Sequence, residues 1–265
     1  MRRETNDPPS ALIPATFLQI GKSSKFTLKY GDAFINPLPQ DSTSIIDNPI
    51  FKHLIGPYPP SSTDLAHTSY RSSIHDLRLA SDGSYYRENG GAGHSWLFAT
   101  RSGRIISSGP GAPFGNEMSL TRSKLLGILS TLYILYNAET NYPIQQGTAI
   151  FLSYELTPAT AVLSSRRPPI SLATQDDHDI IMEIYHINEH LKTKISIEQI
   201  QRNKKNQVET PEIASCEEAS HIAQKFGSES LENYSTPSKF LSTIKYNLIT
   251  ERYRCTNSKR LYRNN

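Results

Sequence analysis

Residues 77–108 read LRLASDGSYYRENGGAGHSWLFATRSGRIISS, and the fold is decided in this stretch. Residues 77–81 alternate between apolar and polar side chains, as a half-buried strand does, and Asp82-Gly83 follows as a turn signal. Residues 94–100 predict a second strand, and a tight turn leads into a third strand over residues 104–108. The stretch therefore predicts an antiparallel meander of three strands.

Helices and strands alternate in the chain that follows. Apolar residues recur at helical spacing from 125 to 136, and Ser119 or Thr121 can cap the start of this helix. Residues 148–153 form an almost continuous apolar run, which is typical of a buried central strand. A second helix with the stripe 180–191, a strand over 194–200 and a last helix over 212–226 come next. This order predicts an α/β fold, with a mixed five-stranded sheet and helices on both faces.

Composition divides the chain of 265 residues into three parts. Residues 1–73 are rich in Pro, Ser and Thr and predict an irregular segment of short elements, with a Pro-rich linker at 56–62. Residues 74–226 predict the α/β domain, and residues 227–265 a basic C-terminal tail.

Charge and cysteine content restrict the class of protein. The net charge of +3 and the pI near 8.7 are compatible with a nucleic-acid partner without requiring one. Two cysteines are too few for a disulfide scaffold, so we expect an intracellular protein of the cytoplasm or nucleus. The apolar stretch 125–136 is too short to cross a bilayer, and we expect no membrane span.

Particular residues resemble the ribonuclease H superfamily. Residues 81–84, Ser-Asp-Gly-Ser, with the glycine-rich 90–93 and the strand of Trp96, are similar to the family's opening hairpin. Residues 121–127, TRSKLLG, are similar to the start of its first helix. Residues 55–58, Ile-Gly-Pro-Tyr, resemble a loop that precedes the first strand in ribonuclease H domains of retroelement polyproteins, which are the closest likeness. The resemblance implies a ribonuclease H-like fold.

The family's chemistry is hydrolysis of the RNA strand of RNA–DNA hybrids. Two Mg²⁺ or Mn²⁺ ions, about 3.5–4 Å apart, hold the attacking water and the leaving oxygen. The resemblance implies four carboxylates to bind them, from the first strand, the first helix, the end of the fourth strand and the last helix.

This chain departs from that set of carboxylates. Asp82 matches the first-strand aspartate and is the candidate metal ligand, whereas Lys124 and Tyr154 stand where the next two carboxylates are expected. Three further positions belong to the set: Glu155, one residue after Tyr154; Glu217, in the last helix; and Asn203, which replaces a loop histidine.

These substitutions predict impaired catalysis. An ammonium group at Lys124 would compete with a metal ion and could neutralise Asp82, but it cannot activate water as a metal does. A shift of one residue along a strand sends the side chain to the opposite face, so we expect Glu155 to be a poor substitute for the missing aspartate.

Three functions remain open at this level. The first is a degenerate ribonuclease H-like domain that retains nucleic-acid binding at most, and the second is an active nuclease that uses Asp82 with Glu155 and Glu217. The third is a protein-interaction scaffold that kept only the fold. The candidate nucleic-acid contacts are Ser84, Arg122, Arg252, Arg254, Lys259 and Arg260.

Two further groups look like metal ligands but have a simpler interpretation. Residues 176–179, Asp-Asp-His-Asp, precede a helix and fit a capping role. His186 and His190 are four residues apart without the glutamate of a zinc-protease motif, which favours a solvated helix face.

Overall fold

The computed structural model describes residues 26–30, 54–88, 90–112, 118–155, 163, 177–201, 210–229 and 246–250. The chain forms two compact units, one of Pro39–Phe240 and one of Met1–Leu38 with Leu241–Asn265. In the smaller unit, β1 (Phe26–Tyr30) pairs antiparallel with β7 (Tyr246–Thr250). The predicted domain boundaries after residues 73 and 226 stay predictions.

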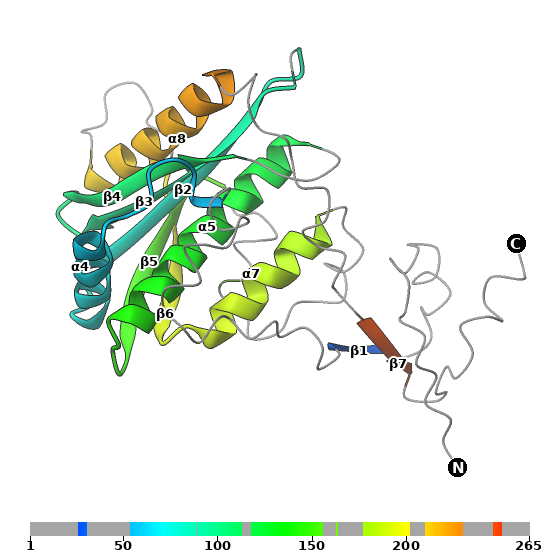
Figure 1. Cartoon of the computed structure of the whole chain (residues 1–265), viewed down its shortest axis with the longest axis horizontal. Coiled ribbons are helices and arrows are strands. Elements are labelled where there is room, and N and C mark those ends of the chain that lie inside the picture. The colour runs from blue at the N-terminus through cyan, green and yellow to red at the C-terminus, as the bar shows by residue number, and fades with distance from the viewer. Residues whose placement is uncertain are drawn as a thin grey trace, which may run out of the picture. The chain divides into compact units, whose positions relative to one another are not determined.

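A five-stranded sheet in the order β4-β3-β2-β5-β6 is the centre of the larger unit (Figure 1). Its strands are β2 (Leu77–Tyr85), β3 (Ala92–Thr100), β4 (Ile105–Gly111), β5 (Gly147–Ser153) and β6 (Thr193–Gln199). The first three are antiparallel, whereas β5 runs parallel to β2, and β6 runs parallel to β5. The predicted meander and the mixed sheet are confirmed.

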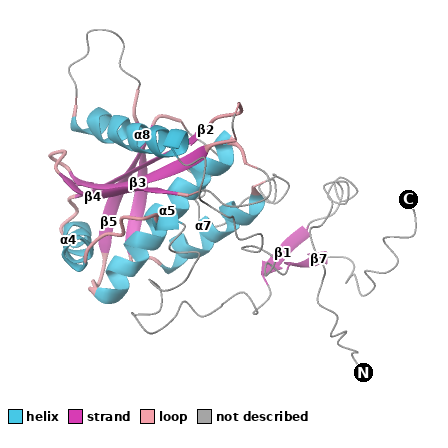
Figure 2. Ribbon diagram, turned by 45° about the horizontal axis from the view of Figure 1, so that its top comes forward, coloured by secondary structure: helices cyan, strands magenta, loops and turns pink. Residues whose placement is uncertain are grey.

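Helices cover both faces of this sheet, as the sequence predicts (Figure 2). The helices are α4 (Ser62–Ser73), α5 (Leu120–Asn141), α7 (His178–His190) and α8 (Pro211–Glu229). On one face α8 packs on β2 and β3; on the other, α5 packs on the same strands, and α4 and α7 pack on α5. All nine residues of β3 are buried, because this strand is covered from both sides. Among the described residues, no helix is long and apolar enough to cross a membrane.

Local sequence accounts for the ends of the helices. Ser119 is the N-cap of α5, and its side chain accepts a hydrogen bond from the Arg122 backbone N–H at 3.0 Å. Ser61 and Asp64 form a capping box at the start of α4, just beyond the Pro-rich stretch. Leucine and isoleucine on most sides of α5 bury it between the sheet and its helical neighbours.

Strand β2 continues through Asp82-Gly83, so the turn that we predicted at this dipeptide is wrong. Both residues pair with β3, and the chain turns only after Tyr85. A glycine is needed in mid-strand because α5 approaches β2 closely there. A Cβ atom on Gly83 would collide with the backbone of Ser123 and Lys124.

Two buried side chains of β3 bind the backbone of Leu54 and Ile55, which precede the first strand of the domain. The Nε2–H of His94 donates to the Leu54 carbonyl oxygen at 2.9 Å, and Trp96 Nε1–H donates to that of Ile55 at 3.1 Å. Both side chains are fully buried. Burial lowers the pKa of His94 to about 4, although the hydrogen bond to Leu54 opposes this shift. His94 is therefore neutral at pH 7.

Acid is expected to destabilise the fold through His94. The folded pKa of about 4 lies below the ordinary 6.5, so its contribution is complete above pH 6.5 and is lost as the pH falls towards 4. The free energy of unfolding should fall by roughly 3 kcal/mol from this residue across that window. Urea unfolding at successive pH values measures this fall in the free energy of unfolding.

The matched variants are His94→Gln and His221→Gln, because His221 is exposed on α8. His94→Gln should flatten the decline between pH 6.5 and 4, whereas His221→Gln should leave it as in the wild type. An unchanged decline in His94→Gln would contradict the prediction.

Candidate functional site

The candidate site lies where β2 extends beyond the end of its neighbour β5. The pairing between these strands ends at Ala80↔Leu152, so Ser81 and Asp82 have no β5 partner. A pocket opens at this point, lined by β2, the end of β5, the residues that follow it, and the facing turns of α5 and α8. The carboxyl ends of parallel strands commonly form binding sites, and the resemblance predicted the site here.

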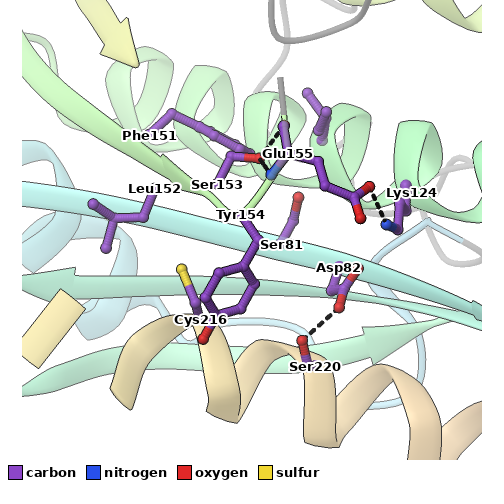
Figure 3. A pocket seen from close by; sticks show the side chains of 11 residues that line it. Ser81, Asp82, Lys124, Phe151, Leu152, Ser153, Tyr154, Glu155, Cys216 and Ser220 are labelled. Carbon is purple, nitrogen blue, oxygen red and sulfur yellow. Dashed lines mark hydrogen bonds and ion pairs between the residues drawn. The ribbon is translucent and has the colours of Figure 1, made fainter. Parts of the chain in front are cut away.

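Asp82 is held on the α8 side of the sheet. One carboxylate oxygen accepts a hydrogen bond from Ser220 Oγ at 2.5 Å, and the other accepts from the Gly83 backbone N–H at 2.8 Å. Figure 3 shows the Ser220 side chain directed at Asp82 from α8. Hydrogen bonds to both oxygens fix the direction of the carboxylate.

Lys124 enters from α5 and pairs with Glu155. Its Nζ lies 2.7 Å from Glu155 Oε2, and the two side chains are 24% and 58% exposed (Figure 3). Sequence reasoning expected Lys124 to neutralise Asp82, but no ion pair joins these two described residues. Lys124 therefore places a fixed cation in the pocket, with Glu155 as its counter-ion.

Glu155 reaches the pocket although strand alternation predicted that it would point away. Strand β5 ends at Ser153, and residues 154–155 form a bend, so alternation no longer applies. Ser153 Oγ stabilises this bend by donating to the Glu155 carbonyl oxygen at 2.7 Å. The carboxylate thus turns back towards α5.

Tyr154 fills the place where the resemblance expects a carboxylate. Its ring packs against an apolar cluster between the sheet and α8 that includes Leu152 and Cys216. Its hydroxyl donates to the Ile213 carbonyl oxygen at 3.4 Å. The side chain is therefore part of the packing under α8 and supplies no anionic ligand at neutral pH.

Helix α8 turns Cys216 and Ser220 towards the pocket, one helical turn apart. Glu217 is exposed and does not line the pocket. Burial raises the pKa of the Cys216 thiol to about 12, with smaller contributions from nearby acids that include Asp82 and Glu217. Cys216 is therefore a protonated packing residue, and sequence reasoning missed Ser220 because no motif marked it.

The domain residues that we predicted to contact nucleic acid make contacts within the fold instead. Ser84 is buried and donates to the Ala223 carbonyl oxygen at 2.6 Å. Arg122 is buried and pairs with Asp177 at 3.0 Å, which links α5 to α7. The other predicted residues lie outside the described part of the chain: Asn203, Arg252, Arg254, Lys259 and Arg260.

The capping role predicted for residues 176–179 and the solvated helix face predicted for His186 and His190 agree with the structure only in part. Asp177 occupies the N-cap position of α7 but makes no side-chain capping hydrogen bond, because its carboxylate pairs with Arg122. His190 Nδ1 donates to the His186 carbonyl oxygen at 2.7 Å. Within the described ranges, no group of three or more His, Cys, Asp or Glu is arranged to hold a metal ion.

The pocket residues do not fit a two-metal centre. Asp82 is tied to Ser220, the Glu155 carboxylate is paired with an ammonium group, and Glu217 faces solvent. Two divalent cations need several free oxygen ligands to offset their mutual repulsion.

The strand order and the helices on both faces define a ribonuclease H-like α/β domain. No family model matches the chain, and no curated protein matches it. Among solved structures it is similar to the N-terminal ribonuclease H domain of a Mycobacterium tuberculosis protein, at 13% identity and a TM-score of 0.41, covering 58% of this chain and 96% of that one.

Two further similar structures are ribonucleases H1. That of Halobacterium salinarum is 13% identical with a TM-score of 0.37, covering 57% of this chain and 96% of that one. LC11 ribonuclease H1, in complex with an RNA/DNA hybrid, is 11% identical with a TM-score of 0.42, covering 59% and 99%. Identities and TM-scores of this size say nothing of the activity of this chain. Its fold follows from the strand order and from the packing of the helices on the sheet.

The two polar contacts of the pocket should differ in their contribution to stability. Ser220→Ala leaves a half-buried carboxylate without one of its donors and should lower the free energy of unfolding by roughly 1–2 kcal/mol. Glu155→Gln breaks a pair whose carboxylate is mostly exposed and should lower it by less than about 1 kcal/mol. Urea unfolding compares them, and a larger loss in Glu155→Gln would contradict this assignment.

Proposed function

We propose that residues 74–226 are a retroelement-derived ribonuclease H-like domain that has lost two-metal hydrolysis of RNA–DNA hybrids and retains nucleic-acid binding. The observation that carries this proposal is the Lys124–Glu155 pair in the pocket beside Asp82. The retroelement origin is supported by the sequence resemblance at residues 55–58 and 81–84 alone.

A lysine ammonium cannot replace the metal ions chemically. It carries a single charge on a tethered atom and does not lower the pKa of a bound water as a divalent ion does. Its contact with Glu155 also consumes the only other carboxylate that lines the described pocket with Asp82. The described pocket thus offers Asp82 together with a second carboxylate that is already paired with a cation.

An active nuclease that uses Asp82, Glu155 and Glu217 is the second candidate. Glu155 supports it, because this carboxylate does line the pocket. Glu217 does not support it, because its side chain is exposed and does not line the pocket. The third candidate, a protein-interaction scaffold, shares the loss of chemistry but binds no nucleic acid.

Titration calorimetry with Mg²⁺ and Mn²⁺ tests the loss of the metal site. The wild type should show no metal binding that depends on Asp82, whereas Lys124→Glu should gain it, with an affinity at least roughly tenfold above the wild type. The gain should vanish in Lys124→Glu combined with Asp82→Asn. Glu217→Gln is the control and should behave as the wild type.

A labelled RNA–DNA hybrid incubated with each metal completes the test. Turnover by the wild type that Asp82→Asn abolishes would contradict the proposal and support the active nuclease. If Glu217→Gln also abolished it, Glu217 would be a ligand in spite of its exposure.

A further inference from the structure

Three basic side chains converge at the end of the sheet opposite the pocket. The Nε–H of Arg71 donates to His67 Nε2 at 2.9 Å, and Arg104 Nη2 lies 3.4 Å from the same nitrogen. Arg101 is exposed, like Arg104, and lies in the turn between β3 and β4, where its backbone N–H donates to Asp76. We call His67, Arg71, Arg101 and Arg104 the His67 cluster.

The cluster is built from segments distant in sequence. His67 and Arg71 stand one turn apart on α4, and Arg104 directly precedes β4. Asp76 joins the two parts, because its carboxylate pairs with Arg71 at 2.7 Å and accepts from the Arg101 backbone N–H at 3.0 Å. The arginines therefore hold defined positions beside the N-terminal end of β2.

Positive charge exceeds negative charge in the cluster. Three arginines face two acids, Asp64 and Asp76, which leaves +3 − 2 = +1 with His67 neutral. Both acids are engaged: Asp76 with Arg71, and Asp64 in the capping box with Ser61. Burial, then Arg71 and Arg104, lower the pKa of His67, and Asp64 and Asp76 oppose this shift. Two guanidinium groups beside one neutral imidazole leave donors available to an oxyanion.

Nucleic-acid phosphate fits the surroundings of the cluster. Tyr70 is 56% exposed on the same helix, with the Arg71 guanidinium 5.9 Å from its ring centroid, so an aromatic face lies beside the cations. The domain residues predicted to contact nucleic acid, Ser84 and Arg122, are buried. Binding by the domain therefore requires other exposed cations.

We propose that the His67 cluster binds backbone phosphate of nucleic acid, with Arg104 and Arg101 as the principal contacts and Tyr70 beside them. This inference rests on the proposed nucleic-acid binding and adds its location. It places the contact at the end of β2 away from Asp82, so binding does not depend on the altered pocket.

Fluorescence anisotropy with the full chain and a short labelled RNA–DNA hybrid tests the inference, at salt concentrations from about 50 to 200 mM. Arg104→Gln and Arg101→Gln should each weaken binding roughly threefold and reduce the slope of log K against log salt by about one. Among the described residues the only hydrogen bond of the Arg104 side chain is the one to His67, and the side chain is exposed, so the fold should persist. Lys225→Gln removes an exposed cation from α8 and should leave both values unchanged.

The outcomes separate this inference from the proposed function. If the wild type binds the hybrid and Arg104→Gln and Lys225→Gln weaken that binding equally, the His67 cluster is not the binding site. The proposed function would still stand. No binding by the wild type would overturn the proposed function itself.

A second measurement distinguishes the source of the phosphate. Inorganic phosphate should raise the pKa of His67, followed by its imidazole NMR signals, because an anion offsets Arg71 and Arg104. No rise would overturn the site. If phosphate raises the pKa of His67 but Arg104→Gln leaves hybrid binding unchanged, the ligand of the cluster is a small phosphate compound. That outcome would overturn nucleic acid as its ligand.

Discussion

The close approach of α5 to β2 at Gly83 is the contact on which the domain and its pocket depend. Only a residue without a Cβ lets the backbone of Ser123 and Lys124 rest on the strand. This contact places Lys124 beside the pocket and seats the apolar side of α5 over β2 and β3. A bulkier residue would have to push the helix away, and because interiors are closely packed, the shift would reach α4 and α7 as well.

The charges of the pocket are arranged so that each is already satisfied. Ser220 and the Gly83 backbone hold Asp82, and Glu155 holds Lys124. A binding site for divalent cations needs the opposite condition, in which several carboxylates lack partners until the ion arrives. In the pocket each charged side chain instead has a partner from the chain itself, whereas Arg101 and Arg104 at the opposite end of β2 are exposed.

Much of the fold could be predicted because it depends on local periodicity. Alternation identified β2 and β6, a continuous apolar run identified β5, and helical spacing after a candidate cap at Ser119 or Thr121 identified α5. Where a local signal competed with packing, prediction failed. Asp82-Gly83 has the composition of a turn but continues the strand, because α5 needs the glycine at that point. Asp177 stands at a capping position but pairs with Arg122.

The sequence by itself determined the order of elements from β2 to α8, the place of Asp82 on the first strand of the sheet, and the presence of Lys124 and Tyr154 in place of carboxylates. These follow from residue type and spacing along one segment. Only the tertiary structure decided that Glu155 turns back to Lys124, that Ser220 holds Asp82, and that Arg71 and Arg104 from separate segments meet at His67. Such contacts join residues distant in the chain, and their geometry depends on where strands end and helices pack, which no local pattern encodes.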